Sequence, residues 1–327
     1  MSATPRVVAI GGGTGLSTML RGLKRYCTDI TAIVAMADDG GSSGRLRSEL
    51  GMPPPGDVRN CLQALANTES VIEQLLAYRF HDGSLNGQCL GNLLLAALND
   101  TSDSFGEAVR KLSQVLAITG RVLPSTNSDV ILEAELCDGS CVLGESAIGR
   151  RPARSPAIRR VRLIPEHVRA LPECVRAVQQ ADLILLGPGS LYTSVIPNLL
   201  LEELSAAIAA SDAVRVYILN VMTQPGETVG YTASDHIRAL FAHGGGHLFD
   251  YCLANDLPAP EPVLARYAAD GAAQPLIDRT AVAALGVQLI GAPVADWSNA
   301  LARHDPNTLA AAIASLYRER SHTRIYR

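Results

Sequence analysis

The sequence is poor in features that mark several broad classes of protein. Aromatic residues make up only 4% of its 327 residues, with one tryptophan and four phenylalanines, so no aromatic box for a large planar cofactor is evident. It also lacks any apolar run of about 18 residues, the length that a membrane-spanning helix needs. We therefore expect no insertion into a membrane.

An excess of positive charge is also missing. The chain has 28 Lys and Arg against 32 Asp and Glu, a formal net charge of −4, whereas a general nucleic-acid binder carries a basic surface. We expect no nucleic-acid partner, so an anionic ligand would have to be held by a local site. The first residues lack the basic segment and long apolar segment of a secretory signal, which predicts a cytoplasmic protein.

The seven cysteines are scattered and form no C-x-x-C pair, so the sequence supports neither a disulfide framework nor a zinc ribbon. We expect most of them to be small buried apolar residues. Cys137 and Cys141 bracket an Asp-Gly-Ser turn that is typical of a hairpin and could bring the two thiols near each other. A metal or redox pair is the alternative at that turn.

The chain does contain enough apolar residues for a large core, 47% of the total. Short apolar runs end in glycine or polar loops and alternate with segments of helical spacing, a pattern typical of a buried parallel sheet. The predicted fold is therefore α/β, a Rossmann-like, doubly wound and mainly parallel sheet. The expected strands are residues 7–10, 30–37, 181–186, 214–219 and 248–254.

The pattern of apolar residues changes in the middle of the chain. Apolar helical stretches are followed by alternation around the Asp-Gly-Ser turn, which predicts a β-hairpin at residues 130–143. We expect one α/β domain over residues 1–327, with an inserted helical and β-hairpin subdomain over about residues 57–165. Six arginines at 150, 151, 154, 159, 160 and 162 predict an exposed connection, although their charge could also attract phosphate.

A glycine-rich loop follows the first expected strand and opens a helix. Backbone N–H groups and the positive helix end at such a place can receive a phosphate, while a tight structural turn is the alternative. The loop does not match the P-loop pattern, and the third glycine of the dinucleotide fingerprint is replaced by Leu16. It consists of Gly11, Gly12, Gly13, Thr14 and Gly15.

Two adjacent carboxylates, Asp38 and Asp39, follow the second expected strand. The carboxyl edge of a doubly wound sheet is where ligands bind, so this pair could hold Mg²⁺, with Asp38 as the metal ligand, or a ligand hydroxyl. Ser42 and Ser43 come next and would let a ligand approach the backbone. The alternative is a turn with solvated aspartates.

Further polar loops extend the candidate binding set. Asp57 follows three prolines and a glycine and is expected to be a helix N-cap, and Arg59 could balance the aspartates or contact a phosphate. Asn92 opens an apolar helix. Two later loops follow buried strands, so the sequence predicts a nucleotide-sized cleft at one sheet edge. These loops contribute Gly189 and Ser190, and Asn220.

Other chemistries have little support. His243 and His247 are separated by three glycines, which disfavour the helix that would align them for zinc. No G-x-S-x-G elbow is present, so hydrolase-type nucleophilic catalysis is not indicated. The candidate catalytic acids are Asp38 and Asp39, and no catalytic residue is established.

The motifs GGGTGLS, ADDGGSSGRLR, PPPGDVRN, GNLLLAAL, ADLILLGPGSLYTSVIPNLL and NVMTQPGETVGYTASDHIRAL together resemble the YvcK-like gluconeogenesis factors. The resemblance covers nearly the whole chain. The wider superfamily is similar to 2-phospho-L-lactate transferase, or CofD-like proteins.

The resemblance implies a cytoplasmic regulator that binds a UDP-sugar such as UDP-N-acetylglucosamine, without an established reaction, and that affects carbon metabolism, cell-wall synthesis and cell shape. It implies sugar-nucleotide contacts at Tyr267 and Arg303, neither of which local sequence would have selected. Regulatory protein partners and a homodimer are further expectations. The alternative is a Mg²⁺-dependent transferase that acts on a nucleotide-diphosphate-linked substrate, with Asp38 and Asp39 as metal or substrate ligands. An NAD-dependent oxidoreductase is disfavoured by the missing third glycine.

Overall fold

The computed structural model describes residues 4–298 and 301–325, and its centre is a seven-stranded parallel sheet. The strand order is β10-β9-β8-β7-β1-β2-β3, which confirms the predicted Rossmann-like α/β fold. The strands are β1 (Val7–Gly11), β2 (Ile30–Val34), β3 (Arg121–Pro124), β7 (Leu183–Leu186), β8 (Val214–Ile218), β9 (Tyr251–Asn255) and β10 (Gln288–Ala292).

The strand order reverses between β1 and β7. From β1 the chain proceeds to β2 and β3 on one side, whereas β7 to β10 extend the sheet on the other side. The loops that follow β1 and β7 therefore leave neighbouring strands in opposite directions. In open α/β sheets this topological switch point is where ligands bind.

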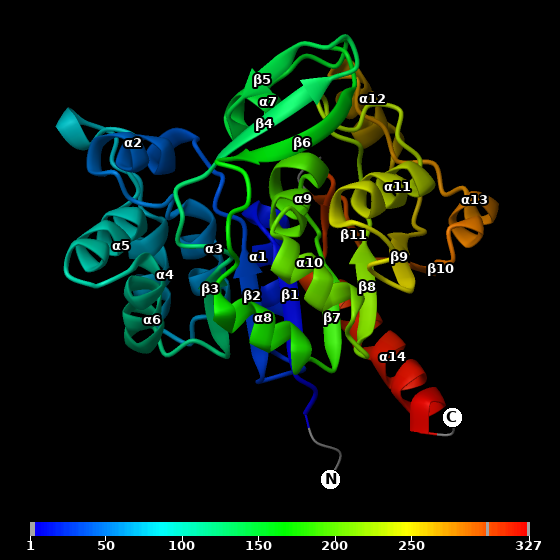
Figure 1. Cartoon of the computed structure of the whole chain (residues 1–327), viewed down its shortest axis with the longest axis horizontal. Coiled ribbons are helices and arrows are strands. Elements are labelled where there is room, and N and C mark those ends of the chain that lie inside the picture. Colours follow the sequence, from blue (N-terminus) through cyan, green and yellow to red (C-terminus); the bar gives the residue numbers. More distant parts are fainter. Residues whose placement is uncertain (1–3, 299–300, 326–327) are drawn as a thin grey trace.

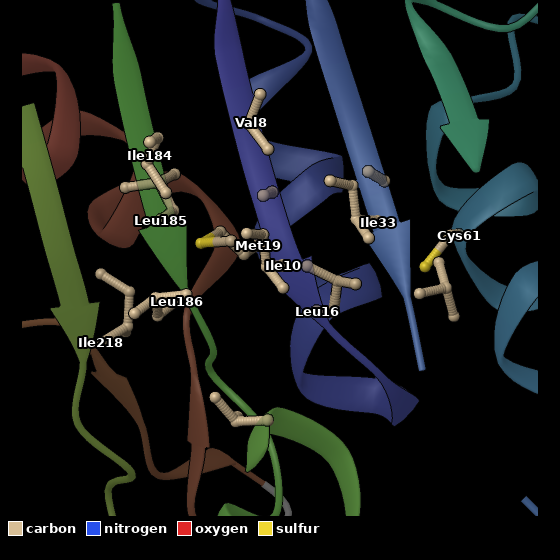
Figure 2. Close-up of a cluster of buried hydrophobic side chains, with 14 of the residues drawn as sticks. Val8, Ile10, Leu16, Met19, Ile33, Cys61, Ile184, Leu185, Leu186 and Ile218 are labelled. Atoms are coloured by element: carbon tan, nitrogen blue, oxygen red, sulfur yellow. The ribbon is translucent and has the colours of Figure 1, made fainter. Parts of the chain in front are cut away.

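The centre of the sheet is buried on both faces. All residues of β1, β2 and β7 are buried, which explains why their sequences are continuous apolar runs rather than alternating ones. Figure 2 shows Leu16 and Met19 from the following helix against Ile10, while Ile33 of β2 lies toward Cys61.

Helices cover both faces of the sheet. On one side α1 packs against α3 and α14, and on the other α10 packs against α8, α9 and α11. Figure 1 shows α8, α9 and α10 in front of the central strands. The helices named here, with two further C-terminal ones, are α1 (Gly13–Leu23), α3 (Gly56–Leu65), α8 (Pro172–Gln179), α9 (Ile196–Leu199), α10 (Glu202–Ala209), α11 (Ala233–Gly244), α12 (Glu261–Ala269), α13 (Arg279–Ala284) and α14 (Pro306–Ile325).

A second, antiparallel sheet in the order β5-β4-β6 is inserted between β3 and α8 and lies at the carboxyl-end side of the main sheet (Figure 1). It includes the predicted hairpin. β3 falls within residues 57–165 but joins the main sheet, so elements of the expected insertion lie both before and after it. The remaining elements are α2 (Gly41–Leu50), α4 (Ser70–Ala77), η1 (Gly83–Leu85), α5 (Leu90–Asp100), α6 (Phe105–Val115), β4 (Ile131–Leu136), β5 (Cys141–Leu143), α7 (Glu145–Gly149), β6 (Ile158–Ile164), the π-helix η2 (Leu191–Val195), β11 (Ala295–Asp296) and β12 (Arg303–His304).

Two local predictions were wrong. Arg159, Arg160 and Arg162 are not in an exposed connection, because β6 pairs with β4 and the three side chains form ion pairs with Glu135 or Glu133. Asp57 is not the N-cap of α3. Pro55 occupies that position, so the Asp57 carboxylate lies in the first helical turn.

The cysteine prediction fits the structure in its main part. Five cysteines are buried, whereas Cys137 and Cys141 are exposed at the hairpin, and all seven thiols are free. The Asp-Gly-Ser turn is closed by hydrogen bonds from Ser140 to the Asp138 carboxylate. No helix in the described part of the chain is long and apolar enough to cross a membrane.

Candidate functional site

The glycine loop after β1 leads directly into α1, whose first turn carries no acidic residue and whose N-cap, Gly12, has no side chain to cap it. The positive end of the helix dipole favours an anion at this point, and the N–H of Gly13 already donates to the Asp57 carboxyl group. A Cβ atom at Gly15 would lie 2.6 Å from the carbonyl oxygen of Pro188. The loops after β1 and β7 can approach this closely only because residue 15 is glycine.

An amide clamp joins the loop after β7 to the loop after β8. Asn220 Nδ2 donates to the carbonyl of Gly189 at 2.8 Å, and the N–H of Gly189 donates to Asn220 Oδ1 at 3.3 Å. Both ends of the Asn220 amide are therefore engaged by the neighbouring loop. Asn220 positions the two loops relative to each other.

A cavity of about 320 Å³ lies between these loops and the C-terminal part of the chain. Its lining combines the N-terminal turn of α1, the loop that precedes the π-helix η2, the ring of Tyr267 and the guanidinium group of Arg303. Seven of the predicted binding residues line it, namely Thr14, Gly15, Gly189, Ser190, Asn220, Tyr267 and Arg303.

Tyr267 and Arg303 reach the cavity from elements that are distant in sequence from the glycine loops. Tyr267 lies on α12, and its hydroxyl oxygen accepts a hydrogen bond of 3.0 Å from the N–H of Ala302. This bond ties α12 to the segment just before β12, which carries Arg303. One hydrogen bond thus helps to place both side chains at the same cavity.

His304 also lines this cavity, and sequence reasoning missed it. Its Nε2 lies 3.2 Å from the carbonyl oxygen of Leu219, so this nitrogen carries the proton and Nδ1 is left as an acceptor. Burial lowers the pKa of His304 to about 4, although the Leu219 carbonyl opposes the shift. The ring is neutral near pH 7, and only its position next to Arg303 could have drawn attention to it.

Acidic side chains gather on the other side of the glycine loop. A Cβ atom at Gly12 would lie 2.7 Å from Asp57 Oδ2, so the loop packs directly on this carboxylate. Burial and then Asp38 raise the pKa of Asp57 to about 7, while the N–H of Gly13 lowers it. Burial and then Asp38 also raise the pKa of Glu145 to about 8. These two carboxyls can therefore hold or release protons near neutral pH.

The two predicted aspartates have different partners. Asp38 Oδ1 accepts a hydrogen bond of 2.9 Å from Gly40 N–H, whereas Asp39 Oδ1 accepts one of 2.8 Å from Ser146 N–H. Asp39 therefore anchors α7 to the loop after β2, while Asp38 lies nearer Asp57. Ser43 is close to this group as well, because a Cβ atom at Gly56 would contact both Ser43 Oγ and Asp38 Oδ2.

Three other predicted residues lie apart from the cavity, in a hydrogen-bonded group between α2, α3 and α5. Ser42 Oγ accepts from Asn92 Nδ2 at 3.1 Å and donates to Gln88. Arg59 donates to Leu76 O, Cys89 Sγ and Asn60 Oδ1, and forms no ion pair with a described aspartate. This group links α2 and α5 to α3, which carries Asp57. Gly11 likewise ends β1 and accepts a hydrogen bond from Asn198.

Within residues 4–298 and 301–325, no group of three or more His, Cys, Asp or Glu side chains is arranged to hold a metal ion. Asp38 and Asp39 alone supply too few oxygen ligands for a dedicated site. A divalent ion at Asp38 stays a prediction, and it would require further oxygen atoms from a bound substrate.

Sequence reasoning also missed Glu145 and Glu227. Glu227 is buried, and its two carboxylate oxygens accept hydrogen bonds from Tyr192 N–H and Thr193 Oγ1. Glu145 comes from the inserted segment and Glu227 from the loop after β8. Neither residue was singled out in the sequence, since only the fold brings Glu145 near Asp57 and Glu227 near Glu145.

Comparison with known families gives one extensive match. The model of the CofD family, described as 2-phospho-L-lactate transferase CofD, matches residues 7–295. This span contains the whole main sheet, the glycine loops, the acidic side chains and Tyr267, but it ends before Arg303.

Individual relatives match over nearly the whole chain. The gluconeogenesis factor of Bacillus subtilis is 45% identical over 98% of this chain and 100% of its own length. That of Halalkalibacterium halodurans is 47% identical over 94% of this chain and 95% of its own. A crystal structure of a Bacillus halodurans protein is 46% identical, with a TM-score of 0.92 over 95% of this chain and 100% of that one.

Proposed function

Because the chain belongs to the CofD family and resembles gluconeogenesis factors over nearly all of its length, we propose that it is a gluconeogenesis factor that binds a UDP-sugar of the UDP-N-acetylglucosamine type. It acts in the cytoplasm as a regulator of carbon metabolism, cell-wall synthesis and cell shape. The observation that carries the binding proposal is the cavity that combines Tyr267, Arg303 and the N-terminus of α1.

The chemistry of the cavity suits each part of such a ligand. The Tyr267 ring can stack on a uracil base, since aromatic side chains provide flat apolar faces. The Arg303 guanidinium and the N–H groups of Thr14 and Gly15, which line the cavity, are donors for a diphosphate. The hydroxyl groups of Thr14 and Ser190 are available at the same cavity for sugar or ribose hydroxyls.

Calorimetric titration with UDP-N-acetylglucosamine, UDP-glucose, GDP and NAD, each with Mg²⁺ and with a chelator, tests the proposal. We expect selective binding of UDP-sugars that survives chelation, without product formation. Binding of GDP alone, and only with Mg²⁺, would contradict a UDP-sugar regulator.

A transferase is the second candidate, and the acidic side of the glycine loop favours it. Asp57 and Glu145 have pKa values of about 7 and 8, which suit general acid–base catalysis at neutral pH. In this alternative the substrate is linked to a nucleotide diphosphate and Mg²⁺ is required. Asp57→Asn would then abolish turnover while nucleotide binding persists, whereas the regulator predicts no turnover in either protein.

A protein contact is a further part of the proposal. The side chains of Val71, Ile72 and Leu75 on α4 are exposed by 58%, 40% and 45%. Exposed apolar surface of this kind supports a regulatory partner or a second copy of the chain. Sedimentation of the purified protein would separate these two, because only a homodimer forms without another component.

A further inference from the structure

The loop after β8 carries a glutamine whose amide group the fold leaves unused. Gln224 lines the 320 Å³ cavity at the glycine loops, and its side chain forms no hydrogen bond with any residue in the described part of the chain. The residue is only partly exposed, and its Oε1 and Nε2 are not among the fully buried polar atoms that lack a partner, so both atoms reach accessible surface. One acceptor and one donor group are therefore free at the cavity.

Hydrogen bonds hold the backbone of Gln224 in place. Its N–H donates to Thr228 Oγ1 at 2.9 Å, and its carbonyl oxygen accepts from the N–H groups of Glu227 at 3.2 Å and Thr228 at 2.9 Å. These hydrogen bonds close the turn that begins at this residue. A fixed backbone limits the positions that the amide can take, so less conformational entropy is lost when a ligand binds it.

The same loop is bonded to the segment that follows Tyr267. Thr223 N–H donates to the carbonyl of Ala273 at 2.7 Å, and Thr223 Oγ1 accepts from the N–H of Ala273 at 2.9 Å. The N–H of Ala272 donates in turn to the carbonyl of Tyr267 at 2.9 Å. Gln224 and Tyr267 therefore come from two segments that are bonded to each other, and both residues line one cavity.

Other polar side chains of the cavity are engaged or lack this pair of groups. Both ends of the Asn220 amide are bonded to the neighbouring loop, the Tyr267 hydroxyl group accepts a hydrogen bond, and His304 Nε2 faces a backbone carbonyl. No Asp or Glu lines the cavity among the residues that the structure describes. Gln224 supplies the one unengaged amide of the described lining.

An amide matches the polar edge of uracil. The N3–H of uracil is a donor that lies between the acceptors O2 and O4, so Oε1 of a glutamine can accept from N3–H while Nε2 donates to one of the two carbonyl oxygens. Guanine instead presents two neighbouring donors, N1–H and the N2 amino group, which suit a carboxylate. A base that stacks on an aromatic ring leaves this edge free for such contacts. Because the described lining contains a free amide and no carboxylate, it suits uracil better than guanine.

We propose that Gln224 recognises the base of the ligand, with Oε1 as the acceptor for uracil N3–H and Nε2 as the donor to O4 or O2. The assignment rests on the proposed function, because it concerns the uracil of the UDP-sugar that stacks on Tyr267. Gln224 determines which base is accepted, whereas the diphosphate contacts of Arg303 and of the N-terminal turn of α1 are common to all nucleotide sugars.

Calorimetric titration that compares UDP-N-acetylglucosamine with its N3-methyl derivative, in which a methyl group replaces the N3–H donor, tests this assignment. The proteins are the full-length wild type, Gln224→Ala and the matched control Gln114→Ala, which removes an exposed amide on α6. We expect methylation to weaken binding to the wild type and to Gln114→Ala by about tenfold, as the loss of two neutral hydrogen bonds would. In Gln224→Ala the methylation penalty should fall below about threefold, because the partner of N3–H is gone.

The ratio of the two affinities is decisive, because both ligands carry the same sugar and diphosphate. An equal methylation penalty in the wild type and Gln224→Ala, or no penalty in the wild type, would overturn the role of Gln224 and leave UDP-sugar binding intact. A wild type that binds neither ligand would overturn the proposed function and this role with it. If Gln224→Ala does not unfold cooperatively, Gln224→Ser replaces it, and a full penalty in Gln224→Ser would equally overturn the proposal.

Discussion

Tyr267 has two separable parts, a ring that lines the 320 Å³ cavity at the glycine loops and a hydroxyl group that accepts a hydrogen bond from Ala302. Tyr267→Phe should keep ligand affinity within about threefold and lower the free energy of unfolding by about 1 kcal/mol, because only the hydrogen bond is lost. Tyr267→Ala should weaken UDP-sugar binding by about 1–3 kcal/mol, since the stacking face is lost as well. Calorimetry and urea unfolding of both variants check these values.

If Tyr267→Phe weakened binding as much as Tyr267→Ala, the hydroxyl group and not the ring would contact the ligand. Tyr251→Phe is a suitable control, since Tyr251 starts β9 and does not line the cavity.

Glu145 makes stability depend on pH in a defined direction. Its pKa is about 8 in the folded protein and about 4.5 ordinarily, so the folded state binds the extra proton. Its favourable contribution is present below pH 4.5 and is lost as the pH rises toward 8. Between pH 5.5 and pH 9 the wild type should therefore lose about 2 kcal/mol of unfolding free energy that Glu145→Gln keeps. This figure takes about 1.4 kcal/mol per pKa unit and is reduced for the coupling of Glu145 to Asp57.

Urea unfolding of the wild type and Glu145→Gln at both pH values measures this difference. Glu69→Gln removes an exposed carboxylate outside the cluster and should behave as the wild type does. Parallel pH profiles for the wild type and Glu145→Gln would show that Glu145 is ionised and solvated in the folded protein.

The contact between the loops after β1 and β7 is a property of two elements. Gly15→Ala would place Cβ 2.6 Å from the carbonyl oxygen of Pro188, so the loops must separate. We expect a loss of about 1–3 kcal/mol in unfolding free energy, typical of overpacking, together with weaker UDP-sugar binding. Thermal unfolding and calorimetry measure the two effects.

Gly106→Ala provides the matched control, because its Cβ would approach no heavy atom closer than 3.5 Å and the residue lies in α6. This variant should be as stable as the wild type or slightly more stable. Equal behaviour of the two alanine variants would show that the loops have room for a methyl group.

Strands could be predicted from the sequence where both faces of the strand are buried. β1, β2, β7 and β8 are largely buried and mostly apolar, apart from Thr31 in β2 and Arg215 in β8, and they end in glycine or polar loops, so their type and position were evident. The edge strands β3 and β10 are partly exposed and carried no such signal. β6 was not predicted as a strand, because its arginines lie between the buried residues Ile158, Val161 and Leu163. The arginines are tolerated there since one face of that sheet is solvated.

The candidate site divides in the same way. The glycine loops and Asn220 follow predicted strands, so sheet topology alone brings them together. Tyr267 and Arg303 came from the family resemblance, since they reach the cavity through packing of the C-terminal elements. Glu145, Glu227 and His304 have no local signature, and tertiary structure alone reveals them.

At the scale of the whole molecule, the 320 Å³ cavity is lined by parts of the chain that are nearly 300 residues apart, from Thr14 to Arg303. A ligand held there contacts only the folded state, so it should stabilise the protein. At a hundredfold excess over Kd, UDP-N-acetylglucosamine should raise the free energy of unfolding by about 2.7 kcal/mol. Urea unfolding with and without the ligand checks this value, and an unchanged midpoint would contradict binding across these segments.

The central claim is that this cavity binds the UDP-sugar, and the most direct test is parallel calorimetric titration of UDP-N-acetylglucosamine into three proteins. These are the wild type, Arg303→Met and Arg176→Met, a control that removes an exposed arginine of α8. We predict that Arg303→Met loses about 1–3 kcal/mol of binding free energy, the value expected for a charged hydrogen bond, while Arg176→Met binds as the wild type does. Equal affinity in all three proteins would contradict the proposed site.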